Sequence, residues 1–137
     1  MSLRLWHGGV PGLGVGDLIV PGHQRKPVAG CAFCEARAAQ AAGGATPALD
    51  PLALHGDRVY LSTDREYARH YASLYGYGDL YRVEPLGDVQ RSTEDSFETY
   101  LAAQARVLAV YARAVLLTAS QRRALDRAWA AADAARR

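Results

Sequence analysis

The chain has 137 residues, half of them hydrophobic, and a formal net charge of +2. This length suits one domain with one hydrophobic core, and we expect a single domain over residues 1–137. No segment reaches the roughly 20 apolar residues that span a bilayer, and the start lacks the basic-then-apolar pattern of a signal peptide. We therefore expect a soluble, cytoplasmic protein without a membrane partner. The arginines are too dispersed for charge alone to predict nucleic-acid binding.

Short apolar runs bounded by glycine and proline predict strands in the first part of the chain. Residues 3–6 form one such run, which would deliver His7 to the end of a strand, and residues 18–20 form another. The glycine-rich segment between them, residues 8–17, predicts tight turns and a backbone that can approach a ligand closely. An alanine-rich helix is expected over residues 31–40, followed by a loop to residue 57.

The middle of the chain predicts a strand, a helix and a second strand. Residues 58–62 form the first strand, and Thr63 with Glu66 fits a capping box for a helix that runs to about residue 75. Tyr67, Tyr71 and Tyr75 would share one face of that helix. Residues 79–84 alternate like a half-buried strand, which a proline at 85 and a glycine at 87 would close.

The last part predicts a loop, strands and a helix. Residues 90–96 are polar and predict a loop, residues 98–104 are ambiguous, and residues 105–117 predict a long strand or a strand pair. Thr118 and Gln121 form a second capping box. The helix that follows has an apolar stripe of Leu125, Ala128, Trp129 and Ala132. The mixed order of elements predicts an α+β fold without a regular βαβ repeat.

His7, next to Gly8 and Gly9, and the pair Tyr60 and Tyr71, with ten residues between them, point to chemistry on NAD. Cleaving the bond between nicotinamide and ribose passes through an oxocarbenium-like cation. Aromatic faces can hold the leaving ring, and a carboxylate can stabilise the cation. Stacking of this kind contributes about 1–3 kcal/mol per ring face. This pattern predicts a pocket that grips the nicotinamide ring.

The opening of the chain resembles the Arr family, the rifamycin ADP-ribosyltransferases. The likeness rests on His7-Gly8-Gly9, Leu13, Val15-Gly16-Asp17, Ile19 and Pro21-Gly22, which follow the family pattern at matching spacing. It continues through Val59-Tyr60-Leu61-Ser62-Thr63 and Leu80-Tyr81-Arg82-Val83-Glu84-Pro85-Leu86-Gly87. The resemblance covers roughly residues 3 to 88, without much of the segment 24–57.

The resemblance implies a diphtheria-toxin-like fold, a split, strongly bent β-sheet with a few peripheral helices, that uses NAD as co-substrate in the cleft between two small sheets. His7 would bind the ribose, the Gly8 backbone would bind the carboxamide, and Tyr60 and Tyr71 would stack on nicotinamide. The implied catalytic residues are His7, Tyr60 and Glu98, and Gly9 and Ser62 join the NAD-binding set. Asp95 and Glu94 remain alternatives for the acid, since Arr proteins carry an aspartate in this stretch.

The implied activity is NAD-dependent mono-ADP-ribosyl transfer, a glycosyltransferase reaction, onto a rifamycin-like small molecule or a macromolecule. Such an enzyme would serve antibiotic resistance or act as a toxin. One alternative is an NAD glycohydrolase toxin, or a transferase acting on protein or nucleic acid. A further alternative is a non-catalytic module that binds NAD or ADP-ribose.

We expect no metal at the site. Cys31 and Cys34 could bind zinc with His23 and His55, but two cysteines in an alanine-rich helix are more often small buried residues. His55 and His70 stand in no motif and are expected at the surface.

Overall fold

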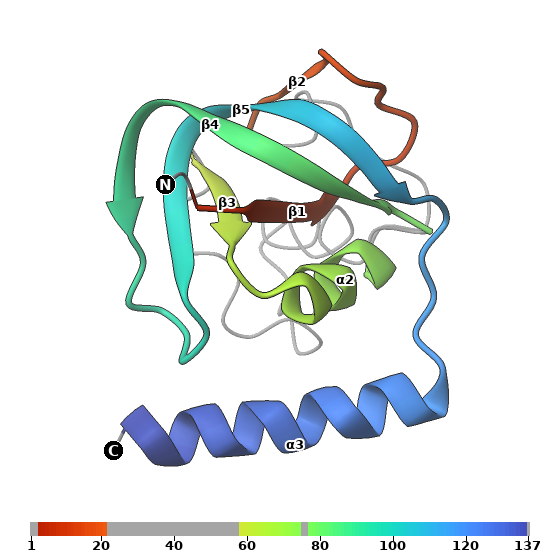
Figure 1. Ribbon diagram of the computed structural model, residues 1–137, viewed down its shortest axis with the longest axis vertical. Helices are drawn as coiled ribbons and strands as arrows, with labels where there is room; N and C mark the ends of the chain where they lie inside the picture. Colours follow the sequence, from red (N-terminus) through yellow and green to blue (C-terminus); the bar gives the residue numbers. More distant parts are fainter. Residues whose placement is uncertain (1–2, 22–57, 75–76, 137) are drawn as a thin grey trace, which may run out of the picture.

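The computed structural model describes residues 3–21, 58–74 and 77–136. The described elements are, in chain order, β1 (Leu5–Gly9), β2 (Leu18–Ile19), β3 (Val59–Ser62), α2 (Arg65–Ser73), β4 (Asp79–Arg91), β5 (Thr99–Ala112) and α3 (Ala119–Arg136) (Figure 1). All described strand pairings are antiparallel. The fold is therefore α+β, as predicted.

The strands hydrogen-bond as one sheet, whereas two small sheets were expected, but the sheet has a weak seam. β1 pairs with β4 over all five of its residues, and β3 pairs with β5 over all four. Between β1 and β3 the register contains a single pair, Trp6 opposite Ser62. The two halves are otherwise joined because β4 and β5 run through both, bending together as a long hairpin (Figure 1).

The β4–β5 register has three breaks. The register shifts at Leu80/Tyr81, at Arg82/Val83 and between Leu86 and Val89, where Gly87 has a φ of 79°. Extra residues of this kind bend and twist the strand that carries them, and glycine adopts the positive φ without steric cost. The bulges therefore let one hairpin serve both halves of the sheet.

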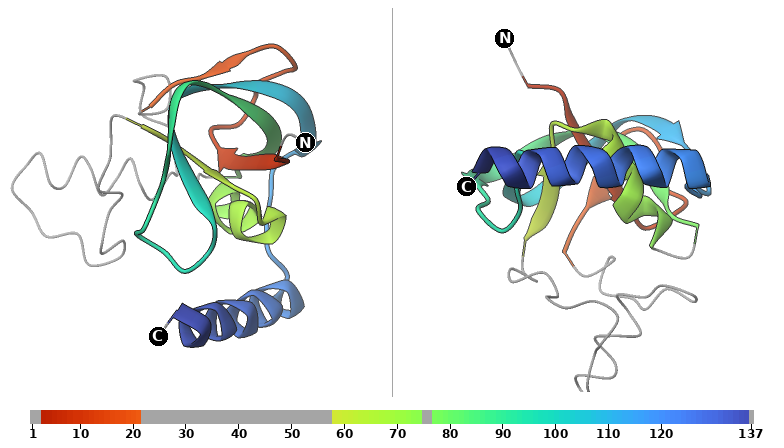
Figure 2. Two further views of the ribbon diagram at one scale, coloured as in Figure 1. Left: turned by 60° about the vertical axis from the view of Figure 1, so that its left-hand side comes forward. Right: turned by 90° about the horizontal axis from the view of Figure 1, so that it is seen from below.

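Three hydrophobic clusters hold these parts together. The first fills the sheet interior and consists of Leu5, Ile19, Val59, Leu61, Tyr81, Val83, Ala102, Ala105 and Val107. The second joins α2 to β1 and β4 through Trp6, Ala68, Ala72, Leu80 and Val115. The third joins α2 to α3 through Tyr67, Phe97 and Leu125, with Tyr71, Leu117 and Trp129 packed around them. Accordingly, α2 lies between the sheet and α3 (Figure 2).

The start of α2 differs from the prediction. The N-cap is Asp64, whose carboxylate accepts from the Tyr67 N–H at 2.9 Å, and not Thr63. The Thr63 hydroxyl instead donates to Glu98 at 2.8 Å, so it is not the group that caps the helix. The helix ends at Ser73 with Leu74 as its C-cap, two residues before the predicted end.

Two strands end later than predicted. β1 does not stop before His7 but continues to Gly9. β4 does not close at residue 84 but runs through Pro85 and Gly87 to Arg91, so the predicted loop at residue 90 begins later. Past Val83, β4 pairs only with β5, and an edge of this kind tolerates proline.

The predicted end of the last strand was wrong, whereas the predicted start of the last helix was right. β5 covers Thr99–Ala112 and ends well before residue 117, because Ala114 has a φ of 48° and its N–H donates to the Asp79 carboxylate. The second capping box is confirmed: the Thr118 N–H donates to the Gln121 side chain at 2.9 Å, and the Gln121 N–H donates to the Thr118 hydroxyl at 3.1 Å. Among the residues that the structure describes, no helix is long and apolar enough to cross a membrane.

Candidate active site

His7 lies where β1 and β3 separate. Its Nδ1 donates to the Tyr60 carbonyl at 2.8 Å. This bond joins the two strands beside the pair Trp6–Ser62, since His7 follows Trp6 and Tyr60 lies two residues before Ser62. Burial lowers the pKa of His7 below its usual 6.5, although the bond to Tyr60 opposes that shift. The ring is therefore neutral at pH 7 with its proton on Nδ1, which leaves Nε2 as an acceptor. An acceptor nitrogen suits a hydrogen bond from a sugar hydroxyl.

The two glycines after His7 are each required by a close neighbour. A Cβ on Gly8 would lie 1.9 Å from the Ala68 carbonyl oxygen of α2, and a Cβ on Gly9 would lie 2.4 Å from Nε2 of His7. Gly8 thus lets α2 pack directly on β1, while Gly9 makes room for the imidazole. Both positions serve the geometry of His7, whatever they contact in a ligand.

The glycine-rich turn after β1 is held by a buried polar network. Asp79, only 2% exposed, accepts from the Gly12 N–H at 2.9 Å and from Arg113 at 2.6 Å. The Tyr81 hydroxyl donates to the Val10 carbonyl and accepts from the Leu13 N–H. Sequence reasoning missed this network, since it read both residues only as part of a strand.

Tyr60 and Tyr71 each lie near the loop of residues 92–98, which we call the acidic loop. The Tyr60 hydroxyl donates to the Glu94 carboxylate at 2.6 Å. The Tyr67 hydroxyl donates to Asp95 at 2.9 Å, and the Tyr67 and Tyr71 rings lie 5.0 Å apart. Burial raises the pKa of Tyr71, and the charges of Asp95 and Glu94 raise it further. Both predicted ring-stacking tyrosines therefore lie near carboxylates of one loop.

Glu98, the first choice for the acid, is engaged elsewhere. Its carboxylate accepts from Thr63 at 2.8 Å, from Tyr100 at 3.1 Å and from Arg91 at 3.3 Å. The Thr63 and Tyr100 bonds, with a smaller contribution from Arg91, lower its pKa. Side chains alternate along a strand, and Tyr100 lies opposite Leu61 whereas Tyr60 lies opposite Leu101. Glu98 therefore shares the Leu61 face of the sheet, and Tyr60 points to the other face.

Ser62 and His70 also differ from their expected roles. The Ser62 hydroxyl donates to the Glu98 carbonyl at 3.1 Å and accepts from the Asp64 N–H at 3.0 Å, so it joins β3 to the start of α2. His70 is half-buried and not fully exposed. It lies between the rings of Tyr71, at 5.1 Å, and Trp129, at 5.7 Å, and burial lowers its pKa.

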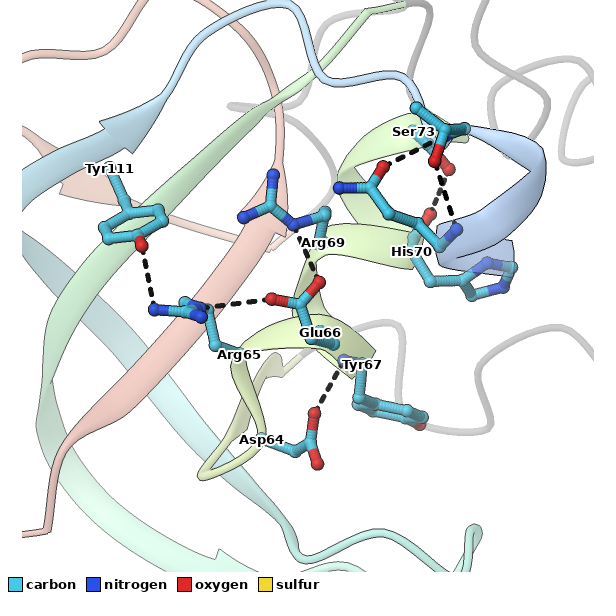
Figure 3. Close-up of polar contacts among 10 residues, drawn as sticks. Asp64, Arg65, Glu66, Tyr67, Arg69, His70, Ser73 and Tyr111 are labelled. Atoms are coloured by element: carbon cyan, nitrogen blue, oxygen red, sulfur yellow. Dashed lines mark hydrogen bonds and ion pairs between the residues drawn. The ribbon is translucent and has the colours of Figure 1, made fainter. Parts of the chain in front are cut away.

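The face of α2 away from the acidic loop is fixed to β5. Figure 3 shows Glu66 between two arginines, accepting from Arg65 at 3.2 Å and Arg69 at 2.9 Å. Arg65 also donates to the Tyr111 hydroxyl at 2.8 Å (Figure 3). The Trp6 ring packs edge-on against Tyr111 at 5.2 Å. These contacts hold the helix that carries Tyr71 in place.

Several predictions concern residues outside the described part of the chain. They are the helix over residues 31–40, the loop that follows it, the position of Tyr75, and the alternative zinc ligands Cys31, Cys34, His23 and His55. No protein-family model and no curated protein matches the chain.

Proposed function

We propose that this protein is an NAD-dependent mono-ADP-ribosyltransferase with a split, bent fold of the Arr-like, diphtheria-toxin-like kind. The motif spacing that resembles the Arr family supports this proposal. The observation that carries it is the seam between β1 and β3. There His7 is held on the Tyr60 carbonyl, and the Tyr60 side chain bonds Glu94. Tyr60 thus joins two groups: its backbone carbonyl holds the imidazole, and its phenol bonds the carboxylate.

In the proposed reaction NAD is a reagent. The bond between the nicotinamide nitrogen and C1 of the adjacent ribose breaks, and its electron pair leaves with neutral nicotinamide. The resulting oxocarbenium ion is attacked at C1 by an acceptor oxygen or nitrogen, whose proton passes to a carboxylate or to water. The products are nicotinamide and the ADP-ribosylated acceptor. This chemistry needs a hydrogen-bond acceptor for the ribose hydroxyl, an aromatic surface for the nicotinamide ring, and a negative charge near the oxocarbenium ion.

The described residues supply these three elements. Nε2 of neutral His7 accepts a hydrogen bond from a ribose hydroxyl. The backbone of Gly8 and Gly9 lies beside His7 and orients the nicotinamide carboxamide. Tyr60 and Tyr71 offer the rings on which nicotinamide stacks.

We assign the acidic role to Glu94. It is exposed, so a ligand can reach it, and its carboxylate already contacts the Tyr60 hydroxyl. Glu94 also falls in the stretch after Val83-Glu84-Pro85 where the Arr resemblance places an acid. Asp95 is the second choice, because it bonds Tyr67 at 2.9 Å and lies near Tyr71.

Matched substitutions of the two glutamates test the assignment. With NAD labelled in both its nicotinamide ring and its adenosine part, Glu94→Gln should lower release of labelled nicotinamide about a hundredfold, the size of effect seen when one electrostatic stabiliser is removed from an active site. Glu98→Gln serves as the control and should leave release within about threefold. The reverse order would return the acidic role to Glu98.

The acceptor is tested in the same assay, with a rifamycin, DNA, RNA and cell lysate offered in parallel. Label on one of them identifies the acceptor class, a rifamycin-like small molecule or a macromolecule. Nicotinamide released equally without any acceptor identifies an NAD glycohydrolase. Measurable NAD affinity with no release identifies a binding module and refutes the transferase proposal.

A further inference from the structure

The helix α3 contacts the acidic loop on both sides of Glu94 and Asp95. Before this pair, Arg136 donates to the Thr93 carbonyl at 2.5 Å. After it, the Ser96 hydroxyl donates to Asp133 at 2.5 Å. The next residue of the loop, Phe97, is buried against Trp129, with ring centroids 5.3 Å apart. The helix thus holds both ends of the segment that carries the acids.

These contacts come from one face of α3. Leu125, Trp129, Asp133 and Arg136 are spaced by four, four and three residues, so they form one stripe along the helix. Leu125 and Trp129 anchor the stripe in the aromatic cluster with Tyr67. The two polar residues extend it beyond the apolar part, where they reach the acidic loop. The apolar residues pack the helix against the third cluster, and the polar residues at its C-terminal end hydrogen-bond the acidic loop.

Bonds between its own residues also shape the acidic loop around Glu94 and Asp95. The Glu94 N–H donates to the Ser92 hydroxyl at 3.2 Å, and the Ser96 N–H donates to Asp95 at 2.6 Å. Both bonds join loop residues to one another, whereas the Tyr67 hydroxyl, which donates to Asp95, and the Phe97 ring, 4.6 Å from the Tyr67 ring, join the loop to α2. The contacts from α3 add a second constraint, because α3 packs on the same Tyr67 side chain.

We propose that α3 is a positioning element: Trp129, Asp133 and Arg136 fix the acidic loop so that Glu94 meets Tyr60 and Asp95 meets Tyr67. The link to catalysis rests on the proposed function, whereas the effect on the loop does not. A carboxylate displaced by about 1 Å from its productive position can cost a large part of the rate. Loosening α3 should therefore lower turnover while NAD still binds at the β1–β3 seam.

The test compares the double variant Asp133→Ala/Arg136→Ala with Arg127→Ala, which changes an exposed residue of the same helix. The double variant keeps Leu125 and Trp129, so the helix stays docked, whereas Trp129→Ala could unfold the cluster. Amide hydrogen exchange in residues 92–98 should become about tenfold faster in the double variant and stay unchanged in the control. Unchanged exchange in the double variant would overturn the inference, whether or not the protein cleaves NAD.

Kinetics then separate the two proposals. The double variant should lower kcat for nicotinamide release about tenfold and leave the Kd for NAD within about twofold. Asp133→Asn keeps an oxygen that accepts from Ser96 and should recover most of the rate. A kcat equal to that of Arg127→Ala would refute the role of α3 in the reaction. A wild-type protein that neither binds nor cleaves NAD would refute the proposed function, while the exchange experiment would still decide whether α3 holds the loop.

Discussion

Replacing Gly8 by alanine tests whether the packing of α2 on β1 sets the geometry around His7. The new Cβ would lie 1.9 Å from the Ala68 carbonyl oxygen and 2.6 Å from the Ala72 nitrogen, both backbone atoms of α2. Ordinary contact begins at 3.4 Å, so the helix would have to retreat by about 1.5 Å, which is 3.4 minus 1.9. A helix backbone cannot yield locally without losing its own hydrogen bonds. The whole of α2 must move.

The loss of stability follows from the apolar contacts that the movement of α2 breaks. Overpacking of this kind costs about 1–3 kcal/mol, and separation of Ala68 and Ala72 from Trp6 and Leu80 adds lost burial. We expect the free energy of unfolding to fall by about 3 kcal/mol or more. Urea unfolding followed by tryptophan fluorescence measures this change, as a lower midpoint with an unchanged slope.

Gly9→Ala is the matched control at the neighbouring position. Its Cβ would meet the far end of the His7 side chain, 2.4 Å from Nε2, and an imidazole can rotate away. This variant should lose only about 1 kcal/mol of stability but should bind NAD more weakly. A Gly8→Ala protein that loses less stability than Gly9→Ala would refute the packing argument.

Two further predictions concern pH. Asp79→Asn should lower the free energy of unfolding by about 2–4 kcal/mol at neutral pH, because a neutral amide cannot replace a buried carboxylate that accepts from Gly12, Arg113 and Ala114. Burial alone would raise the pKa of Asp79, but those bonds lower it below 3.8, so its contribution is complete above that pH and disappears as the pH falls through the folded-state pKa. The gap in urea midpoint between wild type and Asp79→Asn should therefore narrow in acid; a constant gap would contradict this. For His7, burial lowers the pKa in the folded protein, so protonation of the unfolded chain destabilises the wild type as the pH falls below 6.5. Urea midpoints should drop less between about pH 7.5 and about pH 5.5 in His7→Asn than in wild type, and equal drops would argue against a neutral, buried imidazole.

Local pattern was enough to predict much of the element order. The capping box at Thr118 and Gln121 formed as predicted because both bonds join residues three apart, which no distant part of the chain needs to arrange. Strands near residues 5, 18, 59 and 79 followed from apolar runs between turn residues. The position of Tyr60 on a strand was therefore available from sequence alone, whereas His7 was expected just after a strand and lies within β1.

Only the tertiary structure decided how long the strands are and which acid meets which tyrosine. The sequence predicted that a strand ends at Pro85. Instead β4 continues through this residue as an edge strand, because there it pairs with β5 alone. Glu98 and Glu94 are four residues apart, yet Glu98, which directly precedes β5, bonds Thr63 and Tyr100, while Glu94 meets Tyr60. The sequence determines which side chains are present and how they alternate locally. Strand register and the docking of α3 determine which of them meet, because those contacts join residues more than 30 positions apart.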